Sequence, residues 1–125
     1  MDINLFESLV IRAIEGLPEE FQDRMENIDV VVEDNPTLTQ INKAGLRTPG
    51  RLLGLYEGIP TTRRSSSYGM ALPDKITLFK EPIEAGCTND DEIKTAIEKV
   101  VLHEIAHHFG ISDERLDELG KGKPD

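Results

Sequence analysis

The sequence holds a single cysteine, no tryptophan, and only 14 lysines and arginines against 24 aspartates and glutamates. One cysteine, Cys87, excludes an internal disulfide, and this suits a reducing compartment. No apolar run approaches the roughly 20 residues that a helix needs to cross a bilayer. The first ten residues, MDINLFESLV, carry acids where a secretory signal carries bases. We therefore expect a cytoplasmic protein that has no membrane partner.

The excess of acids gives a net charge of −10, which bears on the possible partners. This charge repels a polyphosphate, so we expect no nucleic-acid partner. It would favour a basic substrate or partner, although a surplus of acids also arises simply as a solvated surface. The chain contains no P-loop, no GxGxxG motif and no serine-nucleophile elbow, so the chemistry that these motifs mark is not indicated.

The 125 residues are enough for one domain, 1–125, with a modest core. Apolar residues at helical spacing predict an N-terminal helix over 3–16, and Pro18 can open a short helix that ends near Glu26. The β-branched segment 28–33 predicts a buried strand. Residues 34–50 show no clear period and are expected to form a connector.

The second half of the chain predicts more strands, followed by helices. Segment 52–56 is a strand candidate, and 68–72 and 75–79 are expected to form a hairpin around Pro73-Asp74. Thr88 and Asp91 resemble a capping box for a helix that ends at Gly110. Ser112 would cap a last short helix. This order predicts an α+β domain with a small mixed sheet.

The predicted long helix carries the pattern H-E-x-x-H at His103-Glu104-Ile105-Ala106-His107. Residues four apart on a helix lie one above the other, so both imidazoles can bind one ion. A carboxylate directly after the first histidine can reach a water on that ion and act as a general base. We therefore predict His103 and His107 as metal ligands and Glu104 as the catalytic base.

A third ligand is expected just beyond the helix. Gly110 can turn the chain sharply, and Asp113 follows three residues later, which completes the pattern H-E-x-x-H-x-x-G-x-x-D. Apolar residues surround the motif, so burying its polar side chains without a metal would be costly. Zn²⁺ is the preferred ion, although two histidines and one carboxylate also suit iron and other divalent ions.

Other polar residues near the motif have weaker assignments. His108 points roughly 100° away from His107, which predicts a packing or supporting role. Cys87 is expected to be a loop thiol, or else a thiolate that ligates and silences the metal. Tyr56, Tyr68 and Arg115 are the candidates for steadying an oxyanion.

Residues 103–113 resemble the zincin metallopeptidases, with aspartate in place of the third histidine of the metzincin-type motif. The longer run resembles a family of small bacterial minimal zincins, through Leu53–Pro60, Leu72–Phe79 and Val100–Leu119. The resemblance implies a zincin-like fold: a backing helix, a twisted sheet with an antiparallel edge strand, and an active-site helix. It also implies that extended substrate pairs with the edge strand, for which Tyr68, Gly69 and Met70 are the candidates.

Metzincins carry a methionine turn beneath the metal and a lower subdomain that closes the cleft. No methionine follows the motif in this sequence, and we expect the wall that would bind the leaving side of a peptide to be missing or supplied by a partner. Three functions follow as hypotheses. The first is a zinc-dependent hydrolase that acts on a peptide or protein substrate. The second is a zinc-binding module that captures peptides or regulates without turnover. The third is an enzyme that stays latent until a protein partner completes the cleft.

Overall fold

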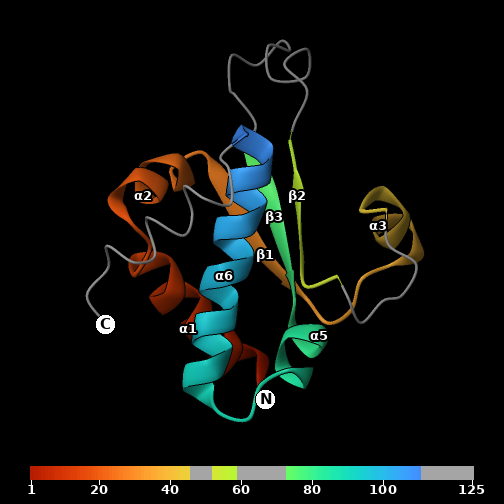
Figure 1. Cartoon of the computed structure of the whole chain (residues 1–125). Helices are drawn as coiled ribbons and strands as arrows, with labels where there is room; N and C mark the ends of the chain where they lie inside the picture. Colours follow the sequence, from red (N-terminus) through yellow and green to blue (C-terminus); the bar gives the residue numbers. More distant parts are fainter. Residues whose placement is uncertain (46–51, 59–72, 111–125) are drawn as a thin grey trace.

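The fold is α+β, as the sequence predicts, with helices on both faces of a three-stranded mixed sheet (Figure 1). The computed structural model describes residues 1–45, 52–58 and 73–110. Within these residues the strand order is β1-β3-β2. None of the described helices is both long and apolar enough to cross a membrane.

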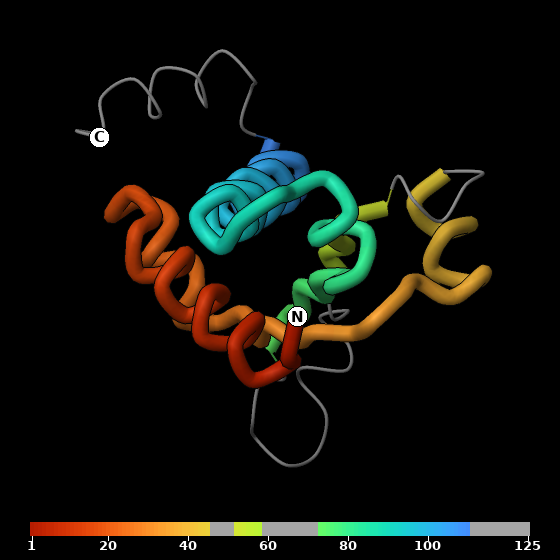
Figure 2. The backbone as a smooth tube through the Cα atoms, turned by 90° about the horizontal axis from the view of Figure 1, so that it is seen from below, coloured from red at the N-terminus to blue at the C-terminus, as the bar shows by residue number. Residues whose placement is uncertain are grey.

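The N-terminal helix, α1 (Ile3–Glu15), is the predicted backing helix. Asp2 caps it by accepting a hydrogen bond from the amide of Asn4. One stripe of the helix is buried, and α1 packs along α6 (Asp90–Phe109), as Figure 2 shows from below. The second helix, α2 (Glu19–Met25), starts directly after Pro18, as predicted.

Strand β1 (Ile28–Glu33) has the predicted bounds, but the prediction that it is buried is wrong. Only Ile28 is buried, Asp29 is exposed, and the remaining four residues are partly exposed. The physical reason is its position at the edge of the sheet, where one flank has no strand neighbour among the described residues.

The connector predicted over 34–50 contains a helix, α3 (Leu38–Lys43). Thr37 accepts a hydrogen bond from the amide of Gln40, whose side chain accepts one from the amide of Thr37. This is a complete capping box. The T-x-x-Q spacing was therefore a usable signal, although the segment is too short to show a helical period.

The central strand is β3 (Asp74–Phe79), which pairs in parallel with β1 and antiparallel with β2 (Gly54–Glu57). Both strands were predicted to within two residues. The strand predicted over 75–79 is present, but its predicted pairing with 68–72 in a hairpin is wrong. The partners of β3 are β1 on one edge and β2 on the other. Residues 68–72 themselves lie outside the described part of the chain.

In the described part of the chain, two helices follow β3. The first, α5 (Lys80–Ala85), was not predicted. The second, α6, ends where predicted, at Gly110 in the left-handed conformation with φ 72°. Its N-cap is Asn89, whose side chain accepts a hydrogen bond from the amide of Glu92, and not Thr88, whose hydroxyl bonds the Glu92 carboxylate instead. The predicted helix after Ser112 lies outside the described residues.

Two apolar clusters hold the sheet between the helices. The larger fills the space between α1, α6 and one face of the sheet, where Ile76 and Leu78 are fully buried. The smaller lies on the opposite face under α3 and consists of Ile41, Leu52, Leu55 and Phe79. The sheet is therefore covered on both faces, and β2 is fixed between α3 and α6.

Gly54 permits an unusually close approach between β2 and α6. A Cβ at this position would lie 2.5 Å from Cγ1 of Val100 and 3.3 Å from the carbonyl oxygen of Thr77. The valine side chain is stiff at χ1 and the other neighbour is backbone, so neither can move aside at small cost. The edge strand can therefore lie against the helix only because residue 54 has no side chain.

We expect Gly54→Ala to lower the free energy of unfolding by about 1–3 kcal/mol, the usual cost of overpacking. Gly86→Ala is the matched control, because Gly86 has φ −93° and a Cβ there would meet nothing closer than 4.0 Å. Urea unfolding of both variants measures the difference. Equal stabilities would show that β2 and α6 are not in close contact.

Candidate metal centre

His103 and His107 lie one turn apart on α6, and both side chains are exposed. Their ring centroids are 6.1 Å apart and the rings are nearly perpendicular, at 83°. The structure thus brings the two predicted ligands to one side of the helix. The argument that the motif would be costly to bury does not apply to the histidines, because water reaches them.

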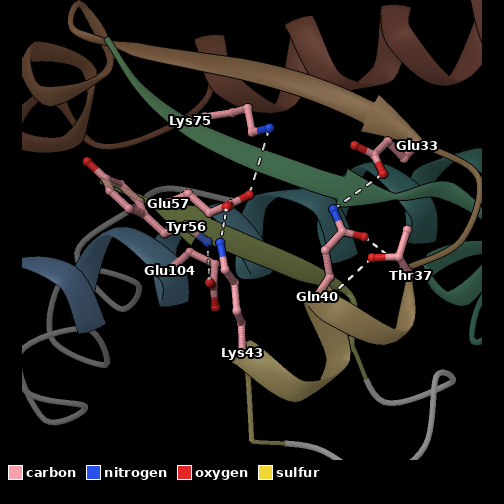
Figure 3. A network of polar contacts seen from close by, with 8 residues as sticks. All are labelled: Glu33, Thr37, Gln40, Lys43, Tyr56, Glu57, Lys75 and Glu104. Atoms are coloured by element: carbon pink, nitrogen blue, oxygen red, sulfur yellow. Dashed lines mark hydrogen bonds and ion pairs between the residues drawn. The ribbon is translucent and has the colours of Figure 1, made fainter. Parts of the chain in front are cut away.

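Glu104 differs from its neighbours because it is half-buried against the sheet. Its Oε1 accepts a hydrogen bond of 2.9 Å from the backbone amide of Tyr56 on β2 (Figure 3). Burial raises the pKa of the Glu104 carboxyl, and the Tyr56 amide and the charges of His107 and His103 lower it by less. A carboxylate whose pKa is raised in this way is a better proton acceptor than an exposed glutamate.

The described donors fit a zinc ion in kind but supply only part of its shell. Two imidazoles at i and i+4 are standard zinc ligands, and a catalytic zinc site needs a third protein ligand. No group of three or more His, Cys, Asp or Glu side chains able to hold a metal occurs within 1–45, 52–58 and 73–110. The predicted third ligand, Asp113, lies outside these ranges, as do Tyr68, Gly69, Met70 and Arg115.

A cleft of about 640 Å³ opens beside the histidine motif. His103, Glu104 and His107 line one end of it. Apolar residues of both walls line much of the remainder, among them Leu52, Leu53, Ala96 and Val100. Lys99 is the one lysine or arginine among the described lining residues. The arrangement places a polar, metal-ligating end next to an apolar floor.

The other side of β2 is tied to α3 and β3 by ion pairs (Figure 3). The Glu57 carboxylate lies 3.0 Å from Nζ of Lys43 and 3.8 Å from Nζ of Lys75. Exposed pairs of this kind contribute at most about 1 kcal/mol each. They therefore help to orient the strand, while the contact with α6 and the buried cluster under α3 hold it.

The side chain of Tyr56 belongs to a separate cluster. Its phenol donates a hydrogen bond of 2.5 Å to the buried carboxylate of Asp74, and its ring stacks on His108 with centroids 4.0 Å apart. Figure 3 shows the phenol directed away from Glu104. The predicted packing role of His108 is confirmed, whereas the phenol of Tyr56 does not face the motif as an oxyanion group would.

Cys87 lies too far from the motif to ligate the same ion. It precedes the first turn of α6, and the 13 residues from Asp90 to His103 span about 20 Å of helix axis. Burial and the neighbouring charge of Glu92 raise the pKa of its thiol, which opposes the thiolate form. Cys87 is therefore a partly buried loop thiol, the first of the two predicted roles.

Sequence reasoning missed two parts of this site. The backbone amide of Tyr56 could not be identified, because nothing in residue type marks which amide will face a distant carboxylate. Lys99 could have been found, since it lies four residues before His103 and so falls on the same helix face.

Comparison with known proteins gives one family. The family described as zincin-like metallopeptidase has a model that matches residues 25–122, from the end of α2 to beyond α6. No curated protein matches the chain. The family match begins well before Leu53, where the first of the resembling stretches begins, and it includes β1, β2 and β3.

In metal-free protein, we expect Glu104→Gln to stabilise the fold at pH 8 and to have less effect at pH 4. The pKa of Glu104 is raised in the folded state, so the folded protein binds this proton more tightly than the unfolded chain does. The stability that the carboxyl contributes is fully present below its ordinary pKa of 4.5 and is lost as pH rises through the folded value. Glutamine keeps an acceptor for the Tyr56 amide and carries no charge.

Urea unfolding in the presence of a chelator, at both pH values, measures this difference. Glu98→Gln is the control, because Glu98 is on the same helix and pairs with Lys94 at 3.4 Å. Its loss should lower stability at pH 8 by a few tenths of a kcal/mol. A Glu104→Gln variant that is less stable than wild type at pH 8 would contradict the prediction.

Proposed function

Since the chain belongs to the zincin-like metallopeptidase family, we propose that it is a zinc-dependent peptidase. The observation that carries the proposal is the position of Glu104, which lies between two exposed histidines, at the end of a cleft, in hydrogen-bond contact with an antiparallel edge strand. A glutamate next to a pair of helical histidines is the arrangement in which a carboxylate can serve as general base for a metal-activated water.

His103 and His107 would hold the ion, with Asp113 as the third ligand. Zinc, when bound, lowers the pKa of a water molecule toward about 7 and polarises a carbonyl group. Both histidines are exposed on one side of α6, so they can take up an ion without rearrangement of the core. The imidazoles must be neutral to ligate, so acid should release the metal.

Glu104 would move the proton. It accepts a proton from the water that attacks the scissile carbonyl carbon, and it later donates that proton to the nitrogen of the leaving amine as the C–N bond breaks. The products are a carboxylate and a protonated amine, which together contain every atom of the amide and of one water. The hydrogen bond from the Tyr56 amide holds one carboxylate oxygen at the strand. The second oxygen can then serve the proton transfers.

Strand β2 would orient the substrate. It is antiparallel to β3, it is an edge strand of the described sheet, and Leu53, Gly54 and Leu55 line the cleft. An extended peptide that adds to such an edge gains affinity from main-chain hydrogen bonds. The participation of Tyr68, Gly69 and Met70 stays a prediction.

We expect Glu104→Gln to reduce peptide hydrolysis by about 10²–10⁴-fold, the usual contribution of a general base. Zinc content should stay near that of wild type, because Glu104 is not a ligand in this mechanism. A quenched-fluorescence peptide library and elemental analysis measure the two quantities on the same preparation. Hydrolysis at the wild-type rate in this variant would exclude the mechanism.

We expect His103→Ala, His107→Ala and Asp113→Ala each to weaken zinc binding by more than the 10–100-fold that loss of a supporting residue costs. Zinc affinity is measured by competition with a chromogenic chelator. His108→Ala is the matched control, since His108 is adjacent in sequence but stacks on Tyr56. Unchanged affinity in Asp113→Ala would remove that residue from the ligand set.

A further inference from the structure

The cleft extends away from the histidine motif toward the start of α6, and this part is not used by the proton transfers. This part is lined by Leu52 and Leu53 on one side and by Ala96 and Val100 on the other, and we call these four residues its apolar floor. Leu53 and Ala96 are partly exposed, so an incoming side chain can reach them. Apolar surface of this kind stabilises a bound aliphatic side chain by removing it from water.

Lys99 stands at the rim of this floor. The residue is exposed and lies one helical turn before His103, on the same side of α6. Asp91 and Glu92 line a neighbouring depression that Lys99 also borders, yet its ammonium group forms no ion pair within the described part of the chain. The other lysine in the middle of α6, Lys94, is instead paired with Glu98 at 3.4 Å.

The helical geometry sets where Lys99 would meet a peptide. Lys99 and His103 are separated by about 6 Å along the helix axis. An extended peptide advances about 3.3 Å per residue, so Lys99 lies about two residues from the level of His103. Strand and helix keep this level in common, because Gly54 lies against Val100 and the Tyr56 amide bonds Glu104.

We infer that this part of the cleft selects peptides in which an aliphatic side chain is next to a carboxylate, and that Lys99 recognises the carboxylate. The inference rests on the proposed peptidase function and names its substrate class. The carboxylate can belong to an acidic side chain or to the free C-terminus of the peptide, because both present the same group to the ammonium.

The test measures peptide binding to the zinc-loaded Glu104→Gln protein by fluorescence anisotropy. Three eight-residue peptides, blocked at both ends, carry a central leucine flanked on both sides by glutamate, glutamine or lysine. A fourth ends in leucine with a free carboxylate and has no acidic side chain. The glutamate peptide or the free-carboxylate peptide should bind roughly three- to tenfold more tightly than the glutamine peptide, as partly exposed charge pairs allow.

Charge reversal by Lys99→Glu should abolish this preference and favour the lysine peptide. Lys94→Glu is the matched control, because it changes the net charge equally on the same helix but does not line the cleft. It should keep the wild-type order of affinities. The preference should also weaken at high salt. Equal binding of all four peptides, or a preference that survives Lys99→Glu, would overturn the inference.

A second variant tests the apolar floor independently. Ala96→Leu fills it with a side chain that favours the helix, and it should weaken the leucine-centred peptides relative to alanine-centred ones. Thr95→Leu adds comparable bulk at a neighbouring position outside this cleft. Unchanged selectivity for residue size in Ala96→Leu would contradict the assignment of the floor.

The outcomes separate this inference from the proposed function. Binding that depends on Lys99 in a protein whose Glu104-containing form cleaves no peptide would support the selectivity and refute the peptidase. Cleavage of all peptides without dependence on Lys99 would support the peptidase and refute the selectivity.

Discussion

The hydrogen bond from the Tyr56 amide to the Glu104 carboxylate is the contact on which the geometry of the cleft depends. It joins the edge of the sheet to the middle of α6, and a second contact, Gly54 against Val100, lies one helical turn away. Four helical residues rise about 6 Å and two strand residues about 6.7 Å. Because these lengths nearly match, β2 and α6 stay level along the cleft, and both walls are set by the same pair of contacts.

Burial against the sheet, more than this hydrogen bond, sets the proton affinity of Glu104. Burial disfavours its charged form, whereas the Tyr56 amide and the two flanking histidines favour it. The net effect is a raised pKa of the Glu104 carboxyl, because the loss of hydration outweighs the favourable contacts. The exposed histidines and the half-buried glutamate thus have different environments although they share one helix. The two proposed ligands are therefore exposed to water, whereas the proposed general base is half-buried against the sheet.

Several local features of this fold could be predicted from sequence, although the short helices α3 and α5 were missed, and the long-range pairings could not be predicted. The bounds of α1, β1 and the C-terminal end of α6 follow from apolar period, β-branched residues and Gly110. The ladder of β3 with both β1 and β2 joins segments far apart in the chain, so turn residues near Pro73 suggested a hairpin in its place. The histidine motif was readable because i and i+4 fix its geometry locally. The Tyr56 amide was not, because its role depends on the position of β2 against α6.

The net charge of the protein and the local charge of Lys99 act in opposite directions on an acidic peptide at the cleft. The net charge of −10 disfavours the approach of an acidic peptide, while Lys99 favours its carboxylate once it is bound. At physiological ionic strength the screening length is about 8 Å, so exposed acids farther than this from the rim act only weakly on a bound ligand. A carboxylate in contact with Lys99 is much closer than that. The overall charge should therefore slow association, whereas Lys99 would decide which peptide remains bound. On this proposal the acidity of the chain as a whole does not predict the charge of its substrate.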